Sequence, residues 1–230
     1  MAHHLSARPA GLSRRAFCTS AVAALDAARW MPAGRADEPT REVKFYRNLA
    51  AGHLGVRADQ RQALDYAVRY GFQAIAPSDD EFAGQPDGAI DEWLAQMKER
   101  GIRYGTAGLP VEFRGDEERF RQDLADLPRR ARLLQRLGVT RVATWLRPGH
   151  NELTYLEHFQ LLERRFREMA TVLKDHDLRL GLEFVGPRTT RASFRYPFVC
   201  AQLDMLELVH AIGTGNVGLL LDSWHWYTSH

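Results

Sequence analysis

The stretch Val217-Gly-Leu-Leu-Leu-Asp222-Ser-Trp-His225 joins a short apolar run to two polar residues directly behind it. The run from Val217 to Leu221 is too short for a helix and has no polar face, which is typical of a strand buried on both sides in a parallel sheet. Asp222 and His225 follow where this strand would end. Because α/β proteins place their chemistry at the C-terminal ends of parallel strands, both are candidate functional residues.

A second stretch, Leu178-Arg-Leu-Gly-Leu-Glu183-Phe-Val185, has the same organisation. Glu183 lies among apolar neighbours at the end of a predicted strand. A carboxylate in such surroundings is costly unless it binds a cation or a hydrogen-bonding substrate. The two stretches therefore predict functional carboxylates at one end of a parallel sheet.

From Val43 onward, short apolar runs alternate with amphipathic stretches that end at glycines. The predicted strands lie within 44–54, 72–76, 102–109, 139–146, 178–185 and 217–221. The predicted helices cover 59–70 (with Leu64, Ala67 and Val68 inward), a stripe from Ile90 to Gly101, 116–137 (where Pro128 is a candidate kink or break), 153–174 and 203–212. A βα unit repeated at roughly 35-residue spacing predicts a parallel sheet formed through right-handed crossovers.

The number of units leaves two architectures open. A closed (β/α)₈ barrel needs eight units, and about six are present, with no helix predicted after the last strand. The sequence therefore predicts either an open six-stranded parallel sheet or a barrel truncated after strand six. A doubly wound dinucleotide-binding sheet is disfavoured, because no Gly-x-Gly-x-x-Gly opens the first helix.

Composition excludes several classes of function. The first 36 residues hold five arginines and one aspartate; taking these from totals of 31 basic and 29 acidic residues leaves 26 and 28. No basic excess remains to indicate a nucleic-acid partner. No apolar run approaches the roughly 20 residues that a membrane span needs. Cys18 lies in the N-terminal segment and Cys200 stands alone, so no internal disulfide is expected.

The N-terminal segment has the features of an export signal. Ser13-Arg14-Arg15-Ala16-Phe17 is a twin-arginine pattern, and a mildly apolar run and small residues follow it. Residues 1–36 are therefore predicted to be a Tat-type signal peptide and linker, which implies a periplasmic or otherwise exported protein. The alternative is a disordered, arginine-containing leader on a cytoplasmic protein.

Glu183 in Gly-Leu-Glu-Phe-Val-Gly-Pro187, together with Asp222-Ser-Trp-His225 behind its apolar strand, resembles the xylose-isomerase-like TIM-barrel family of sugar phosphate isomerases and epimerases. The resemblance runs from about Lys44 to the last residue. It implies an α/β fold, a (β/α)₈ TIM barrel truncated after strand six, over residues 37–230. It also implies that Glu183 and Asp222 bind a divalent metal and that His225 contacts the substrate. The family's further ligands, on strands seven and eight, have no counterpart here.

The function implied is that of a metal-dependent sugar or sugar phosphate isomerase or epimerase, which moves a proton through an enediolate. Carboxylates with an imidazole suit Mn²⁺, Mg²⁺, Co²⁺ or Zn²⁺. Glu183 is the candidate general base as well as a ligand, and His225 would orient a substrate oxygen. The competing interpretation is that Glu183 and Asp222 cap helices or pair with arginines such as Arg188.

Four further residues are candidate substrate contacts beside His225: His53, Glu112, Trp145 and Arg188. Each also fits an ordinary loop or rim residue. The partner is predicted to be a small-molecule sugar, and a homo-oligomer is one open assembly. Two other functions stay open: a lyase or hydrolase for keto-sugars on the same barrel, and a non-catalytic sugar-binding remnant. An apurinic-site endonuclease is disfavoured, because it needs more zinc ligands and a basic face.

Overall fold

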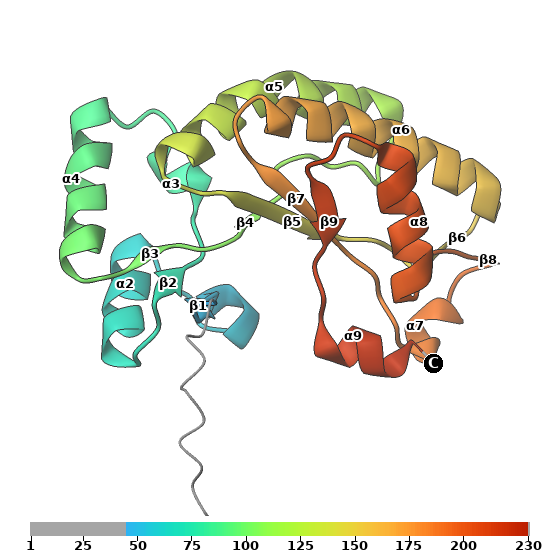
Figure 1. Cartoon of the computed structure of the whole chain (residues 1–230), viewed down its shortest axis with the longest axis horizontal. Helices are drawn as coiled ribbons and strands as arrows, with labels where there is room; N and C mark the ends of the chain where they lie inside the picture. The colour runs from blue at the N-terminus through green and yellow to red at the C-terminus, as the bar shows by residue number, and fades with distance from the viewer. Residues whose placement is uncertain (1–44, 230) are drawn as a thin grey trace, which may run out of the picture. The chain divides into compact units, whose positions relative to one another are not determined.

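The computed structural model describes residues 45–229 and contains six successive βα units (Figure 1). The strands are β1 (Asn48–Leu49), β2 (Ala74–Ile75), β3 (Arg103–Tyr104), β4 (Ala107–Gly108), β5 (Arg141–Trp145), β6 (Gly149–His150), β7 (Arg179–Glu183), β8 (Tyr196–Pro197) and β9 (Val217–Leu219). The helices are η1 (Ala51–Leu54), α2 (Gln60–Arg69), α3 (Asp79–Phe82), α4 (Asp87–Glu99), α5 (Glu117–Arg136), α6 (Tyr155–Lys174), α7 (Arg188–Arg191), α8 (Gln202–Ile212) and α9 (Ser223–Thr228).

The strands that carry the βα units are parallel and form two sheets, ordered β1-β2-β3 and β4-β5-β7-β9. A third, antiparallel pair joins β6 to β8 beyond the C-terminal ends of β5 and β7. The predicted strand 102–109 is divided between the two parallel sheets, because β3 pairs with β2 whereas β4 pairs with β5. Neighbouring barrel strands are staggered along the axis, so one strand can pair with its two neighbours over different halves.

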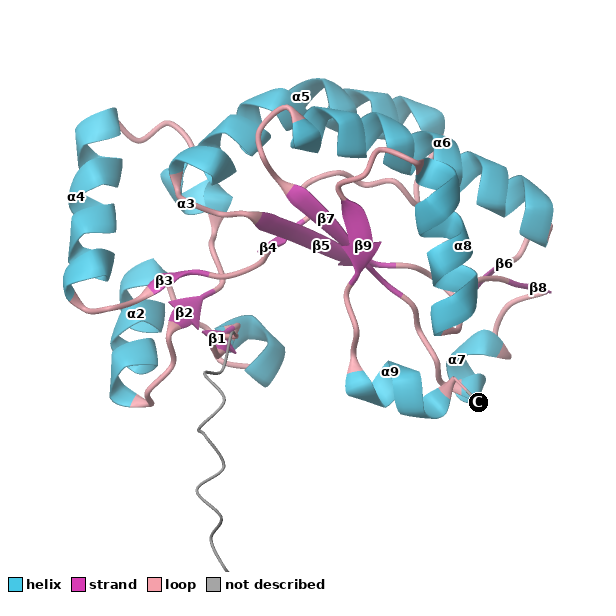
Figure 2. Ribbon diagram, in the orientation of Figure 1, coloured by secondary structure: helices cyan, strands magenta, loops and turns pink. Residues whose placement is uncertain are grey.

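Helices α5, α6 and α8 cover one face of the four-stranded sheet and leave the other face without a helix (Figure 2). Val142, Leu180 and Leu182 point to the covered face and are at most 1% exposed. The uncovered face has small residues: a Cβ atom at Gly181 would lie 3.5 Å from Leu220 Cβ and 3.6 Å from the Ala143 Cβ. The covered face therefore supplies the core, and the uncovered face corresponds to the inside of a barrel.

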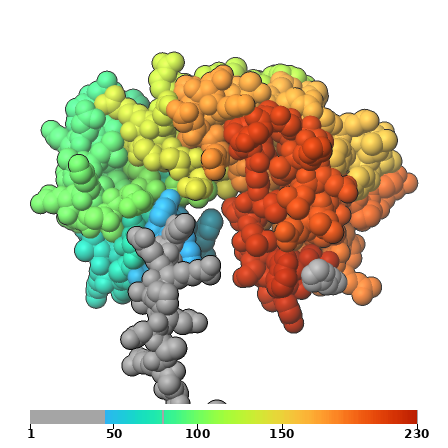
Figure 3. Space-filling view, viewed as in Figure 1, coloured from blue at the N-terminus to red at the C-terminus, as the bar shows by residue number. Residues whose placement is uncertain are grey.

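A hollow of about 390 Å³ lies against the uncovered face and is lined by residues of β5, β7 and β9. Figure 3 shows the surface hollowed between the first βα units, in blue to green, and the red C-terminal segment. Within residues 45–229, β9 pairs only with β7. This arrangement is an open barrel of six units, with the inward face of the sheet accessible.

The local sequence explains where the main helices begin and end. The Asp59 carboxylate accepts a hydrogen bond of 2.8 Å from Gln62 N at the start of α2, and that of Asp116 accepts one of 2.8 Å from Arg119 N at the start of α5. Helix α8 ends at Gly213, whose φ of 71° lies in the left-handed region that glycine adopts at little cost. Such caps fix the points at which the chain turns back toward the sheet.

Four expectations from the sequence need correction. The last strand is half-buried and not buried on both faces, because β9 is an edge strand beside the hollow. A short helix, α9, follows it, although no helix was expected there. Val68 points outward and is 48% exposed. Of the two effects expected of Pro128, a kink or a break, the break does not occur, because α5 continues through it.

The long connection after β7 contains α7 and β8, so it is partly regular structure. The predicted signal peptide and linker, residues 1–36, lie outside the described residues. Among the described residues, no helix has both the length and the apolar character to cross a membrane.

Candidate metal centre

Glu183, Asp222 and His225 converge at the C-terminal end of the four-stranded sheet. Each offers one ligand atom, and the three atoms lie within 4.8 Å of one another. Glu183 is the last residue of β7, Asp222 directly precedes α9, and His225 lies in its first turn. Two carboxylates and one imidazole at this spacing form a donor set that suits a divalent cation.

The electrostatics of Glu183 are those of a carboxylate that lacks a compensating cation. Burial raises its pKa above the ordinary value, the Asp222 carboxylate raises it further, and His225 and His53 lower it. Within residues 45–229, neither Glu183 nor Asp222 forms an ion pair with an arginine or a lysine. Two adjacent carboxylates without a basic partner favour the binding of a metal ion between them.

Asp222 has a second role as the N-cap of α9. Its Oδ1 atom accepts hydrogen bonds from Trp224 N at 2.6 Å and His225 N at 3.1 Å. The capping role that the sequence left open is therefore real, but it occupies only one carboxylate oxygen. Capping and metal binding are compatible, since the second oxygen has no hydrogen-bond partner in the described part of the chain.

The position of His225 depends on a close approach between α9 and the chain segment after β7. Gly186 makes this approach possible, because a Cβ atom there would lie 2.1 Å from His225 O and 2.9 Å from Ser229 N. The Nδ1 atom of His225 is buried and has no hydrogen-bond partner within the described residues. A buried ring nitrogen next to two carboxylates fits a metal ion or a substrate hydroxyl group.

Two of the other predicted contacts lie near the cluster. His53, exposed on η1, is close enough to Glu183 to lower the pKa of that carboxyl group. Trp145 is paired in register with Glu183 on the neighbouring strand and is 47% exposed. Both residues therefore border the space in front of the cluster.

Glu112 and Arg188 are placed differently. Glu112 lies in the connection between β4 and α5, where its carboxylate accepts a hydrogen bond of 2.7 Å from Arg114 N. Arg188 begins α7 and lines a separate hollow with Trp226 and Tyr227. Within the described residues, no contact joins Arg188 to the cluster, so the predicted pairing of Arg188 with the two carboxylates does not occur.

Three further residues support this end of the sheet: Arg114, Gly186 and Arg165. Arg114 follows a predicted strand without forming a motif, and Gly186 lies within the Gly181–Pro187 stretch that also contains Glu183. Arg165 has a clearer signal: it falls on the apolar stripe of α6, beside Phe166 and Met169, and is 3% exposed. A charged residue on a buried stripe indicates a specific partner, and Arg165 donates to Phe113 O at 2.7 Å.

Solved structures with related folds were found by comparison. A xylose isomerase domain protein from Alicyclobacillus acidocaldarius subsp. acidocaldarius is 33% identical, with a TM-score of 0.69 over 80% of this chain and 65% of that one. The IOLI protein with a binding zinc atom is 17% identical, with a TM-score of 0.64 over the same shares. D-psicose 3-epimerase in the presence of D-fructose is 15% identical, with a TM-score of 0.63 over 79% of this chain and 64% of that one.

The chain thus spans slightly less than two thirds of the length of each of these proteins. At 17% and 15% identity, the second and third show the fold alone. No curated protein matches the chain. The model of one protein family, described as xylose isomerase-like TIM barrel, matches residues 64–230. With this match and the parallel βα architecture, the chain belongs to the xylose isomerase-like TIM barrel family, which includes sugar isomerases and epimerases.

Proposed function

We propose that this protein binds a divalent metal ion through Glu183 and Asp222 and acts as a ketose isomerase or epimerase. The observation that carries the proposal is the convergence of Glu183, Asp222 and His225 within 4.8 Å. The ion would be Mn²⁺, Mg²⁺, Co²⁺ or Zn²⁺, the cations that mixed carboxylate and imidazole sets accept. The IOLI structure with a zinc atom and the structure of an epimerase with D-fructose support a small sugar substrate and a metal.

A bound ion would supply electrostatic stabilisation of the negative charge that develops on the substrate oxygens. Glu183 is the candidate general base, because burial raises its pKa and makes the carboxylate a better proton acceptor. His225 would orient a substrate oxygen through its ring N–H or accept a hydroxyl proton. His53 approaches the same carboxylate from η1 and would contact the far end of a polyol.

The experiment is a titration of the purified full chain with Mn²⁺, followed by electron paramagnetic resonance and calorimetry. Glu183→Gln and Asp222→Asn each remove one negative charge and nearly keep the side-chain shape, so each should lower Mn²⁺ affinity by roughly tenfold or more. His225→Ala should lower ketose affinity or turnover more than Mn²⁺ affinity. Glu99→Gln, at the end of α4, is the matched control, because that carboxylate is exposed and lies outside the cluster.

Loss of Mn²⁺ affinity in Glu99→Gln equal to that in the two cluster variants would contradict a specific site. Equal loss in all three cluster variants would make His225 a third ligand. Activity is measured by the interconversion of D-fructose and D-psicose, chosen because one structural relative is a D-psicose 3-epimerase.

A dehydratase is the second candidate, since another structural relative is a probable 3-DHS dehydratase that is 14% identical, with a TM-score of 0.64. Dehydration eliminates water from the substrate, whereas epimerisation keeps its composition. Mass spectrometry of the product therefore separates the two: an unchanged mass supports the isomerase or epimerase, and a loss of one water supports the lyase. Binding of Mn²⁺ and of a ketose without turnover would support the non-catalytic sugar-binding remnant.

A further inference from the structure

Arg114 contacts two aromatic rings, one in the loop after β4 and one at the end of β5, where Trp145 is paired with Glu183. Its guanidinium carbon lies 4.2 Å from the centroid of the Phe113 ring and 4.5 Å from that of the Trp145 ring. Phe113 is buried, and the side chain of Arg114 is 16% exposed. A planar guanidinium in contact with two aromatic rings holds them through cation–π attraction, which is stronger where water is excluded.

Hydrogen bonds fix the orientation of this guanidinium. Its Nη2 atom donates to Thr144 Oγ1 at 3.0 Å and also to the backbone oxygen of Trp145. Its Nη1 atom faces the Glu112 carboxylate at 3.8 Å, and its Nε atom is buried. The donors of Arg114 therefore face other groups of the protein, and its guanidinium does not form an anion-binding site for a ligand.

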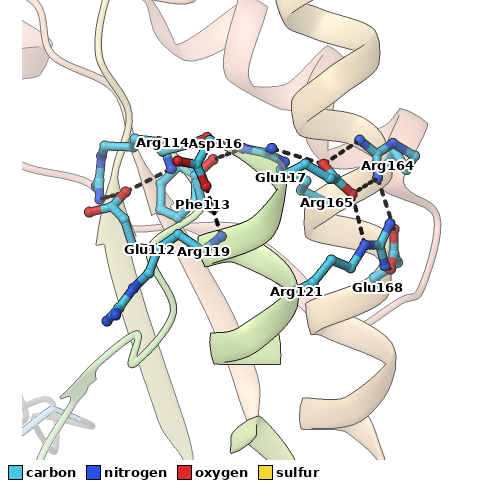
Figure 4. A network of polar contacts seen from close by, with 11 residues as sticks. Glu112, Phe113, Arg114, Asp116, Glu117, Arg119, Arg121, Arg164, Arg165 and Glu168 are labelled. Atoms are coloured by element: carbon cyan, nitrogen blue, oxygen red, sulfur yellow. Dashed lines mark hydrogen bonds and ion pairs between the residues drawn. The ribbon is translucent and has the colours of Figure 1, made fainter. Parts of the chain in front are cut away.

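The loop that carries Arg114 is held in turn by α6. Arg165, whose side chain is 4% exposed, donates from Nη1 to Phe113 O at 2.7 Å and to Gly115 O at 2.8 Å. Its Nη2 atom donates to Glu117 at 2.9 Å. Figure 4 shows this network running from Glu112 and Arg114, through the start of α5, to Arg165. The backbone on both sides of Arg114 is thus fixed before any ligand arrives.

Trp145 is the residue that this arrangement holds beside Glu183. It ends β5 and is paired in register with Glu183 on β7, so the two side chains leave neighbouring strands on the same side of the sheet. With Arg114 against its ring, the residue is still 47% exposed. An exposed indole held in place beside a metal-ligand cluster provides a flat apolar wall for a ligand that the cluster binds.

We propose that Arg114 is a positioning residue, which fixes the indole of Trp145 as the wall against which the C–H face of a ketose lies. The inference rests on the proposed function, because the cluster must bind the ketose oxygens for the carbon face to meet Trp145. Charge alone does not explain the arrangement. A lysine would keep the charge but could neither stack flat on the indole nor donate to Thr144 and the Trp145 carbonyl from one planar group.

The test compares Arg114→Lys and Arg114→Gln with the parent protein in the presence of saturating Mn²⁺. Trp145 is one of five tryptophans, so its own fluorescence and near-ultraviolet circular dichroism are obtained by subtracting the spectrum of Trp145→Phe from that of each protein. Both Arg114 variants should lose the Trp145 dichroism band, bind D-fructose roughly tenfold more weakly and keep Mn²⁺ affinity within about twofold of the parent.

Arg141→Gln is the control, because Arg141 begins the same strand and carries the same charge at the opposite end. It should leave the Trp145 spectrum, D-fructose affinity and Mn²⁺ affinity unchanged. Full retention of the dichroism band and of D-fructose affinity in Arg114→Lys would overturn the positioning role. Equal loss of Mn²⁺ affinity and D-fructose affinity would overturn it too, since the substitution would then disturb the whole site.

The two proposals can fail separately. If the parent binds Mn²⁺ but no ketose, the proposed function fails for ketoses, and the positioning role is then decided by the Trp145 spectrum of Arg114→Lys alone. If the parent binds D-fructose and Trp145→Phe binds it equally well, the proposed role of Trp145 is contradicted. The proposed metal-dependent sugar site is not contradicted by that result.

Discussion

The Oδ1 atom of Asp222 accepts a hydrogen bond from the backbone N–H of His225 at 3.1 Å, so one carboxylate both caps α9 and belongs to the proposed metal centre. The two roles can be separated by substitution. Asparagine caps helices about as well as aspartate but carries no charge. Alanine carries no charge and cannot cap the helix either.

We therefore predict that Asp222→Asn and Asp222→Ala lose Mn²⁺ affinity alike but differ in stability. Asp222→Asn should keep the free energy of unfolding close to that of the parent in metal-free buffer. Asp222→Ala should lose about 1 kcal/mol through the missing cap. Urea unfolding without metal and Mn²⁺ calorimetry are the measurements. Equal destabilisation by both variants would show that the charge, and not the cap, stabilises this end of the fold.

Gly186 controls the distance between α9 and the segment after β7. In Gly186→Ala the new methyl group would lie 2.1 Å from His225 O and 2.8 Å from Thr228 Oγ1, so α9 must move. We expect a loss of about 1–3 kcal/mol in stability and weaker Mn²⁺ binding, because the shift carries Asp222 and His225 away from Glu183. Gly108→Ala is the control, since nothing lies within 4 Å of its added carbon. Unchanged Mn²⁺ binding in Gly186→Ala would show that the cluster tolerates movement of α9.

The sequence predicts that the residues of the cluster lie at neighbouring strand ends. It does not predict the distances between them. Glu183 and Asp222 follow apolar runs, and parallel strands bring their C-terminal ends to one edge, so their proximity could be anticipated. The 4.8 Å spacing depends on the pairing of β7 with β9 and on the turn into α9, which no local pattern encodes.

The same limit explains the errors in the fold. Apolar periodicity records which residues avoid water, but it does not say whether a partner strand lies alongside. The run from Val217 to Leu221 therefore looks fully buried, although β9 is half-buried at a sheet edge. Likewise, the strand over 102–109 has one apolar pattern, and its division into β3 and β4 follows from the stagger of its two neighbours.

His158 should make the stability of the fold fall with acidity. It is 7% exposed on α6, its ring centroid lies 4.2 Å from that of Phe198, and its Nδ1 atom has no partner among the described residues. Burial, with smaller contributions from His150 and Arg147, lowers its pKa from 6.5 to about 4. Since the folded state resists protonation, the unfolded state takes up the proton first as the pH falls.

Stability should consequently be unaffected by this group above pH 6.5 and be lost progressively between pH 6.5 and about 4. The loss attributable to His158 should be of the order of 2–3 kcal/mol at the acid end of that range. His158→Phe keeps an aromatic ring and removes the titration, so its unfolding free energy should fall less over the same pH range. Parallel pH profiles for the two proteins would contradict a buried neutral His158.

Arg165 should contribute far more to stability than its neighbour Arg164, although both contact Glu117 (Figure 4). Hydrogen bonds from Arg164 and then Arg165 lower the pKa of Glu117 to about 2. In Arg165→Met the carbonyl groups of Phe113 and Gly115 lose their donor, and the buried Phe113 carbonyl left unpaired costs about 1–3 kcal/mol. Arg164→Met removes only a partly exposed ion pair, which is worth less than about 1 kcal/mol. Equal urea midpoints for the two variants would contradict this difference.

The free edge of β9 should make the 230-residue chain associate with itself. Within the described residues, this strand has a pairing partner on one side only, and Leu221 beside it is 58% exposed. Unpaired backbone groups next to apolar side chains are a template for pairing with another chain. Sedimentation velocity should show concentration-dependent association, and Leu221→Lys should weaken it because a charge at the edge opposes pairing. Leu203→Lys, on the exposed face of α8, is the matched control and should not change it. A monomer at all concentrations, or equal effects of both lysine substitutions, would contradict association through β9.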